Sequence, residues 1–589
     1  MRGYHHPASG PQRRTTSLGE LLPCQDINCA ESDALTSYNL RDTRPEADLQ
    51  TKQFFREATG LVREYGAIDT LLFASVFVFA LVFTITQFPW FYGNTLGANL
   101  TGALFLAAVP FIFLMLSYWA IGVLMPRTGN DYVWVGRILH PSIGFTWGLV
   151  YVLIVFLAAF IGAGTGPLSF AVSSIFATYG LLGNSAYFTG LGNFFGGAAG
   201  TLELSILFTI LVAAFAIFGS KFVKAFLYTT WIFAIVGMVV MWYILSTTSN
   251  STFVSNWNTL VAGNNASYTY SALQATAASN ASFPGIATGF GAIVAALPFA
   301  FLFLFGGNYA NAFAGEIKNV RKSLPIALFL SLILGLGYWI VTSTLTVNTI
   351  GFNWATTVGY GWISGGSVPG TASYPLPYQP TQPLFLAVSA YPNQLLITLM
   401  FITYFIGSLG PLFAYFWIPS KYLFAWSFDR VIPSKFADVS SKYHTAWVAV
   451  IATAIIAVIA EFLYSYLGYS SYFTMGTVLW GISYTIPGIA LTVFPYVKKD
   501  LFAQAPGWLG KKVAGIPLVS LMGLITTVGF GYVGFIAYSN PAITTVNTNS
   551  LELLGAMIVL GFVIFYLSKW YHKREGLDTS MALKEIPPE

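Results

Sequence analysis

Charge is scarce in this sequence: of its 589 residues only 8% are Asp, Glu, Lys or Arg, while 56% are hydrophobic. A soluble globular domain carries about 25% charged residues, so this composition excludes an ordinary soluble fold. The net charge of +5 does not indicate nucleic-acid binding, because the 27 Lys and Arg residues stand singly or in pairs and form no basic stripe.

Cysteine and histidine are also rare, which excludes several kinds of site. The only two cysteines, Cys24 and Cys29, lie in the polar N-terminal segment, and their spacing fits neither a zinc site nor a disulfide framework. The five histidines lie in tails and polar loops, and no HExxH or GxSxG motif occurs. We therefore expect no metal site, no cofactor and no enzymatic activity. The first apolar run begins near Ile68, so we also expect no cleavable secretory signal.

Long apolar runs, by contrast, are abundant. A bilayer crossing takes roughly 20 apolar residues, and the chain contains twelve runs of suitable length. The sequence therefore predicts an all-α polytopic membrane protein with twelve transmembrane helices. The runs cover 68–88, 103–125, 144–178, 202–219, 225–246, 286–313, 325–348, 393–418, 446–463, 472–496, 516–538 and 551–569.

The basic residues predict the orientation of these spans. All 27 Lys and Arg residues lie in the two tails or in every second loop, and the six loops on the other side have none. Because Lys and Arg collect in cytoplasmic loops, we expect both termini in the cytoplasm and a multi-pass protein of the plasma membrane. Four Asn-x-Ser/Thr sequons lie in the predicted outer loops and are candidate glycosylation sites: Asn99, Asn250, Asn265 and Asn280.

Three stretches in the predicted cytoplasmic loops carry the most specific signal. They read PRTGNDYVW at 126–134, AGEIKNVRKSLP at 314–325, and a longer segment at 420–445 that contains DRVIP. In order and in position they resemble the amino acid–polyamine–organocation (APC) superfamily of transporters, and within it the amino acid permease family. Three positions depart from the family's usual residue: Val320, Ala446 and Arg430.

The resemblance implies a five-plus-five inverted repeat, with substrate held near the midplane by two broken helices. The ten-helix core would occupy 68–500, with helices 1–5 at 68–246 and helices 6–10 at 286–496. One pair of segments is consistent with such a repeat. Segment 131–140 precedes span three on the predicted cytoplasmic side, and segment 382–391 precedes span eight on the predicted outer side. The remainder is expected as a disordered cytoplasmic tail at 1–50, an amphipathic helix at 51–67, helices 11–12 at 516–569, and a cytoplasmic tail at 570–589.

Span six contains the strongest candidate for a broken helix. Two adjacent glycines, Gly306 and Gly307, weaken a helix and expose backbone groups that can bind the carboxylate or ammonium group of a substrate. Phe303 and Phe305 could close over a substrate side chain. Asn308 is an amide where many relatives carry an acid. The other interpretation is that the glycines only permit close helix packing.

The remaining candidates are weaker. Span one has neither Gly nor Pro, so a continuous helix is as consistent with the sequence as a broken one. The residues at the position where relatives break this span are Ala80, Leu81 and Val82. Tyr151 of span three is a pocket candidate by depth, although a buried aromatic is more often packing. A sodium ion could be bound by Ala74, Ser75, Thr403 and Ser408, although Ser and Thr more often bond to their own helix.

The sequence identifies no proton carrier inside the membrane. The acids of the predicted spans lie at span ends: Asp69, Glu203, Glu461 and Glu552. No Lys or Arg occurs from Ala225 to Ile317, so the lysine that some relatives place in span five is absent. Coupling to H⁺ or to Na⁺ therefore stays open.

A channel is the main competing class. Residues 357–361 read TVGYG, a potassium-filter signature, and 527–531 are a near copy. A filter needs four such loops in a ring, whereas the first copy lies in a predicted outer loop and the second inside span eleven. We interpret both as coincidence.

We predict a secondary active transporter (permease) that carries amino acids by alternating access. The absence of charge around 306–308 favours neutral or apolar amino acids. The alternative is a polyamine or other organic-cation transporter of the same superfamily. The expected partners are the small-molecule substrate and the lipid bilayer, without nucleic acid, in a monomer or homodimer.

Overall fold

The computed structural model describes residues 52–53, 60–78, 81–156, 169–262, 268–280, 283–364, 382–467, 469, 478–479, 483–505, 507–539, 546–579 and 583. The predicted tail at 1–50 and the sequon residue Asn265 lie outside these ranges. All described residues belong to one unit, Thr51–Glu589.

The first half of this unit is a series of helices. In chain order they are α1 (Ala67–Val78), α2 (Leu81–Thr95), α3 (Leu100–Leu124), α4 (Asp131–Ile138), α5 (Pro141–Val150), the π-helix η1 (Tyr151–Phe156), α7 (Ser169–Leu182), α8 (Ala186–Gly196), α9 (Ala198–Ile217), α10 (Ser220–Thr247), α11 (Asn250–Val261) and α12 (Tyr270–Ala278).

The second half continues the pattern. It contains α13 (Phe290–Ala295), α14 (Leu297–Leu304), the 3₁₀ helices η4 (Gly307–Ala312) and η5 (Ala314–Glu316), α15 (Val320–Ile350), α16 (Phe352–Ser364), α17 (Gln382–Ala390), α18 (Gln394–Phe428), η6 (Ser434–Ala437), α19 (Trp447–Leu467), α21 (Thr485–Val497), α22 (Lys499–Ala503), α23 (Leu518–Ser539) and α24 (Thr548–Arg574). Strands are minor: β1 (Lys52–Gln53) pairs with β4 (Leu577–Asp578), and β2 (Lys512–Val513) with β3 (Ile516–Pro517).

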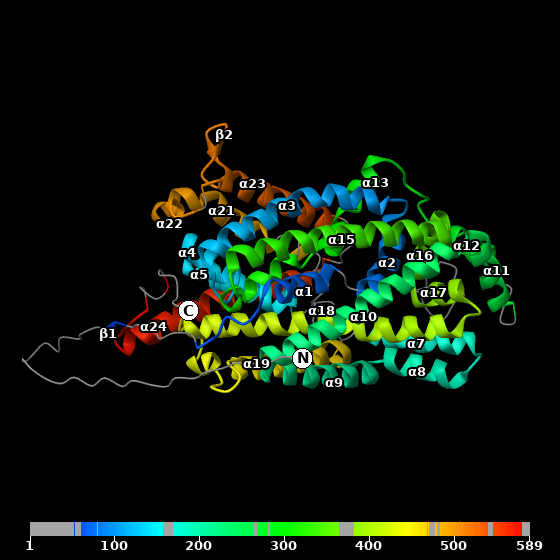
Figure 1. Ribbon diagram of the computed structural model, residues 1–589, viewed down its shortest axis with the longest axis horizontal. Coiled ribbons are helices and arrows are strands. Elements are labelled where there is room, and N and C mark those ends of the chain that lie inside the picture. The colour runs from blue at the N-terminus through cyan, green and yellow to red at the C-terminus, as the bar shows by residue number, and fades with distance from the viewer. Residues whose placement is uncertain are drawn as a thin grey trace, which may run out of the picture. The chain divides into compact units, whose positions relative to one another are not determined.

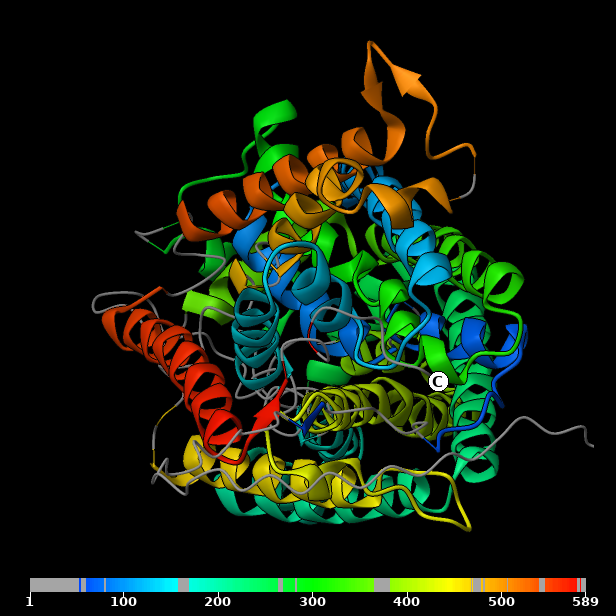
Figure 2. The same ribbon diagram turned by 90° about the vertical axis from the view of Figure 1, so that its left-hand side faces the viewer.

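The molecule is an all-α polytopic membrane protein. Within the described residues eight helices are long and apolar enough to cross a membrane: α3, α9, α10, α15, α18, α19, α23 and α24. Each of the twelve predicted apolar runs overlaps at least one helix. The long helices run side by side, with α4, α22 and β2 at one end of the bundle and α11, α12 and α16 at the other (Figure 1). Viewed from the first end, α24 (red) and the β2–β3 hairpin (orange) lie on different flanks (Figure 2).

The predicted outer loops contain helices of their own. Segment 247–285 includes α11 and α12, and segment 349–383 includes α16. Trp354 of α16 stacks on Tyr270 of α12, with ring centroids 5.2 Å apart, which fixes these helices to each other. The TVGYG segment at 357–361 lies within α16, and its near copy lies within α23. Neither segment has the extended backbone of a selectivity filter.

The amphipathic helix expected at 51–67 is wrong for the residues that the structure describes. Residues 60–66 are not helical, and Tyr65 forms a parallel bridge with Ile317. The carbonyl of Glu316 accepts hydrogen bonds from the backbone N–H groups of Glu64 (2.9 Å) and Tyr65 (3.1 Å). Pairing with the segment that follows η5 therefore holds this part of the chain extended.

Short helices precede spans three and eight, within the paired segments 131–140 and 382–391. Helix α4 is followed at Pro141 by α5, and α17 is followed after Pro392 by α18. They lie at opposite ends of the bundle (Figure 1). This arrangement fits an inverted repeat, which stays a prediction.

Helices α21 and α23 approach each other more closely than side chains would allow. A Cβ atom added to Gly488 would lie 2.8 Å from the backbone nitrogen of Thr527, and one added to Gly523 would lie 2.7 Å from the carbonyl oxygen of Gly488. The two helices are therefore in backbone contact, as small residues permit in membranes.

Candidate substrate site

Span six is interrupted at the predicted glycines. Helix α14 ends at Leu304, Gly306 has φ 114° and ψ −19°, and the chain resumes as η4 at Gly307. A side chain rarely adopts this φ, so glycine permits the turn. The carbonyls of the last turn of α14 lack helical N–H partners. The interruption places backbone groups without partners in their own helix inside the bundle, and their role in substrate binding stays a prediction.

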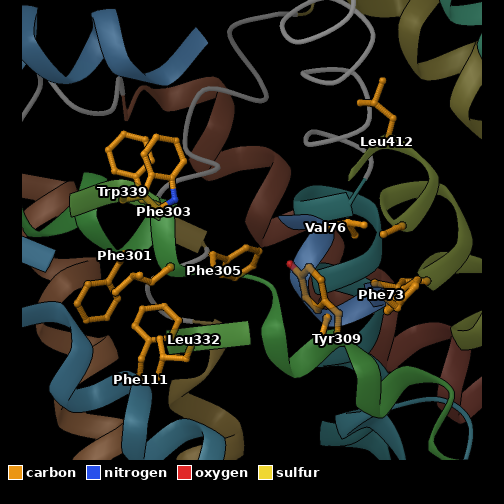
Figure 3. Close-up of a cluster of buried hydrophobic side chains, with 14 of the residues drawn as sticks. Phe73, Val76, Phe111, Phe301, Phe303, Phe305, Tyr309, Leu332, Trp339 and Leu412 are labelled. Atoms are coloured by element: carbon orange, nitrogen blue, oxygen red, sulfur yellow. The ribbon is translucent and has the colours of Figure 1, made fainter. Parts of the chain in front are cut away.

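Aromatic rings border the interruption on both sides. Phe303 stacks on Trp339 of α15 with centroids 4.2 Å apart, and Phe88 of α2 stacks on the same indole at 5.9 Å. Phe305 lies between this group and Tyr309 (Figure 3), with 5.0 Å between the centroids of Phe305 and Tyr309. The wall is apolar, and its rings are buried and pack on one another.

Asn308 is fully buried, and only one of its two polar side-chain atoms has a hydrogen-bond partner among the described residues. Its Oδ1 accepts a hydrogen bond from the hydroxyl of Tyr484 at 3.1 Å. Its Nδ2 has no hydrogen-bond partner among the described residues. A buried unsatisfied donor costs about 1–3 kcal/mol, which a ligand that accepts a hydrogen bond would recover.

Span one is helical on both sides of residues 79 and 80, which lie outside the described residues. Helix α1 is described to Val78 and α2 from Leu81, so Leu81 and Val82 are helical, while Ala80 is one of the two residues outside the described ranges. Helix α1 packs against η4, and Phe73 contacts Phe313 edge-on with centroids 4.7 Å apart. The structure therefore places span one against the interruption of span six, and a break in span one stays a prediction.

Tyr151 is connected to Asn308 through Tyr484, a residue that the sequence analysis did not single out. Tyr151 lies in η1, is 1% exposed, and interacts with the hydroxyl of Tyr484, which also holds Asn308. Its ring lies 6.0 Å from that of Tyr422 in α18, and the ring of Tyr118 in α3 lies 6.0 Å from that of Tyr484. We call Tyr118, Tyr151, Tyr422 and Tyr484 the tyrosine layer. No local pattern marks it, because its members are spread over four elements.

The candidate sodium ligands are bonded within their own helices. Ser75 donates to the carbonyl of Leu72 (3.1 Å), Thr403 to those of Leu399 and Met400 (2.9 Å each), and Ser408 to that of Tyr404 (2.6 Å). Ala74 and these three residues are all buried. Helix α18 reaches α1 where Gly410 faces Val76. Among the described residues no three His, Cys, Asp or Glu side chains are grouped so as to hold a metal ion.

The three family-like stretches meet at one end of the bundle. Arg137 and Asp429 form a buried ion pair at 2.6 Å, and Lys421 and Glu316 form another at 2.6 Å. The N–H of Gly129 donates to the carbonyl of Ala312 at 3.1 Å, which joins the first stretch to η4. We call Arg137–Asp429 and Lys421–Glu316 the inner ion pairs. They close this end of the bundle.

A small cavity of about 30 Å³ lies toward the other end, between α2, α15, α16 and α17. Its lining includes Phe88, Tyr92, Thr346 and Trp354. Phe88 also belongs to the aromatic wall of span six, with its ring centroid 6.1 Å from that of Phe303. The cavity therefore ends at the wall that separates it from the interruption.

The described glycosylation candidates differ in exposure. Asn99 is exposed and caps α3 by accepting a hydrogen bond from Gly102 N (3.0 Å). Asn250 is exposed, with its Nδ2 donating to the carbonyl of Thr349 at 3.0 Å. Asn280 is only 6% exposed, which argues against a glycan there.

Comparison with known proteins adds one finding. A family model described as "Amino acid permease" matches residues 70–564, which covers the interruption in span six and all three family-like stretches. No curated protein matches the chain.

Proposed function

The chain belongs to the amino acid permease family, and from that premise we propose that it carries neutral or apolar amino acids across the plasma membrane by alternating access. At the coarser level, it is a multi-pass membrane transporter of amino acids or related organic compounds. The proposal includes twelve spans with cytoplasmic termini, a five-plus-five inverted repeat over 68–500, two flanking helices over 516–569, and tails at both ends.

The unpartnered amide of Asn308 carries this proposal. Its Nδ2 is a buried donor next to an interrupted helix, and a substrate carboxylate would accept its hydrogen bond. The carbonyls of the last turn of α14, which have no partners within that helix, would accept bonds from the substrate ammonium group. A zwitterionic amino acid supplies both groups at once.

The neutrality of the surroundings favours an uncharged substrate side chain. No Asp, Glu, Lys or Arg occurs from Phe290 to Ala312, and the nearby wall is formed by Phe303, Phe88 and Trp339. A charged side chain at this depth would need a buried partner of opposite sign. The same aromatic faces support the second candidate, an organic cation held by cation–π contact.

Two steps test the proposal. A thermal-shift screen of the full-length protein against the common amino acids and polyamines identifies a ligand, because a ligand that binds the folded state raises its stability. Uptake of that ligand is then measured in proteoliposomes, with spermidine as competitor. We expect uptake of a neutral amino acid that spermidine does not inhibit. Strong inhibition by spermidine would replace this function with organic-cation transport.

A substitution at Asn308 locates the site. Asn308→Leu removes the donor while keeping similar volume, and a hydrogen bond to a charged group is worth about 1.5–3 kcal/mol, so the Kd of the identified amino acid should rise about 10- to 100-fold. Asn353→Leu, at an exposed position of α16, is the matched control and should bind normally. Normal affinity in the Asn308 variant would place the substrate elsewhere.

A further inference from the structure

Asp131 is a buried acid at the inner end of the bundle. It is the first residue of α4 and is 3% exposed. Its Oδ2 accepts a hydrogen bond from the hydroxyl of Tyr118 at 3.1 Å, and its Oδ1 accepts one from the hydroxyl of Tyr422. The sequence places Asp131 in a loop between two spans, whereas the structure places it against two members of the tyrosine layer.

Asp131 differs from the other buried acids at this end. Glu316 has Lys421 and Asp429 has Arg137 as cationic partners. Among the described residues no Lys, Arg or His forms an ion pair with Asp131. A buried carboxylate without a cation is costly and tends to take up a proton.

The groups that face Asp131 do not supply a compensating charge. They are the phenols of Tyr118 from α3, Tyr422 from α18, Tyr151 from η1 and Tyr484, which immediately precedes α21. Helix α5 has no titratable side chain, and Arg137 on α4 itself is bound to Asp429. Burial raises the pKa of Asp131 to about 6, against the opposing effect of hydrogen bonds from Tyr422, Tyr118 and backbone N–H groups.

The tyrosine layer connects this acid to the candidate substrate site. Tyr118, which donates to Asp131, contacts Tyr484 edge-on, and Tyr484 donates to Asn308. A second link runs through Asn311 of η4, whose Nδ2 donates to the backbone carbonyl of Tyr118 at 2.9 Å. The segment that carries Asn308 is thus bonded to the layer at two points.

We infer that Asp131 is the proton-binding residue of this carrier and that the tyrosine layer links its protonation to the substrate held at Asn308. The carboxylate takes one proton from water on the side of higher acidity, and the carboxylic acid releases that proton to water on the other side. This inference rests on the proposed function, and it supplies the group that sequence analysis does not find.

Hydrogen-bond chemistry explains how the link would operate. A carboxylate only accepts hydrogen bonds, whereas a carboxylic acid donates one. When Asp131 is protonated, the hydroxyl of Tyr118 or Tyr422 must turn from donor to acceptor. That turn changes the contacts of the layer, and Tyr484 would carry the change to Asn308, because Tyr484 touches Tyr118 edge-on and donates to Asn308.

The first test measures proton binding without a substrate. Infrared spectra of the full-length protein in nanodiscs are recorded as pH is lowered, in the Glu461→Gln background. Glu461 is a second buried acid, in α19, bonded to Ser465 at 2.6 Å, and its removal leaves Asp131 as the one buried acid without a cationic partner in the part of the chain that the structure describes. We expect a protonated-carboxyl band that grows around pH 6 and is absent after Asp131→Asn. A spectrum without that band overturns the inference even if the substrate is never identified.

The second test measures coupling in proteoliposomes with the amino acid found by thermal shift. One proton per substrate gives up to about tenfold accumulation for a gradient of one pH unit. Glu461→Gln should keep this accumulation, whereas Asp131→Asn should lose it and exchange substrate at a rate that no longer depends on pH. Tyr484→Phe should keep the infrared band and lose most of the accumulation, because the link to Asn308 is removed.

The two proposals fail in distinguishable ways. Absence of uptake of any neutral amino acid by the wild-type protein contradicts the proposed function, while the infrared titration still decides whether Asp131 binds a proton. Uptake with the same pH dependence in Asp131→Asn and wild type contradicts the inference and leaves the function standing. Loss of that dependence in Glu461→Gln would assign the proton to α19. Restoration of accumulation by Asp131→Glu, together with the infrared band, separates proton binding from a purely structural role.

Discussion

Gly306 is the single residue on which the interruption of span six most depends. Its φ of 114° would strain an alanine by about 1–3 kcal/mol. Gly306→Ala should therefore lower thermal stability and weaken binding of the amino acid together. Gly337→Ala, at an exposed helical position of α15 with open space around it, should be neutral or stabilising by up to about 1 kcal/mol. Equal effects in the two variants would contradict a special role for Gly306.

Asp131 should make the free energy of unfolding decrease as pH rises. Its pKa is about 6 in the folded protein and about 3.9 in an unfolded chain, so the folded state binds the proton more tightly. Stability should therefore fall as pH rises from about 4 to 6, and the loss is complete above that window. Asp131→Asn should remove a penalty on the order of 3 kcal/mol at pH 7. Melting temperatures from pH 4 to 8 check this, with the exposed Asp500→Asn variant as control.

At the scale of single residues, the sequence predicts where glycines interrupt a helix better than it predicts which side chains contact each other. Adjacent glycines in an apolar run indicate a weak helix, and Gly306 and Gly307 do interrupt span six. The tyrosine layer has no such signature, because Tyr118 and Tyr484 are distant along the chain and meet only after the helices pack. Asp131 could not be recognised as buried for the same reason.

At the scale of elements, the inner ion pairs join the third family-like stretch to the second and to Arg137, which follows the first stretch. Removing one partner of a buried pair costs about 3–5 kcal/mol, whereas an exposed pair is worth about 0–1 kcal/mol. Lys421→Met should therefore destabilise the protein far more than Lys224→Met, since the Lys224 side chain, paired with Asp69 at 3.0 Å, is 29% exposed. Melting temperatures of both variants test this.

The double variant Lys421→Met/Glu316→Gln separates charge from packing. It removes the unpaired carboxylate, so it should recover much of the stability lost in Lys421→Met. A double variant as unstable as the single one would show that Lys421 acts through its packing over Trp417 rather than through Glu316.

Element boundaries were predictable where local chemistry decides them. The apolar runs overlap helices, and the short helices before spans three and eight appear at their predicted places. Span one has no Gly or Pro, and its residues 79 and 80 lie outside the described ranges, so its continuity stays a prediction. Residues 60–66, within the helix expected at 51–67, pair with the chain near Ile317 instead, because a contact distant in sequence overrides local propensity there.

At the scale of the whole molecule, the distribution of Lys and Arg predicts cytoplasmic termini, and the chain offers a direct check. Its only cysteines, Cys24 and Cys29, lie in the N-terminal tail. A membrane-impermeant thiol reagent should therefore label the native protein only after the cells are permeabilised. Ser271→Cys, at an exposed position of α12, should be labelled in intact cells when both native cysteines are Ser. Labelling of the native protein in intact cells would reverse the orientation.

The contact between α21 and α23 has a consequence for genetics. Neither Gly488 nor Gly523 can accept a methyl group without separating the two helices, and α21 begins immediately after Tyr484. A selection for lost uptake should therefore recover Gly488→Ala among variants that resemble substrate-site mutants. Second-site revertants should map to α23, at positions that let its backbone move away from α21, and revertants confined to span six would contradict this. Helix α23, which lies outside the ten-helix core, would then behave in genetic tests as part of the substrate site.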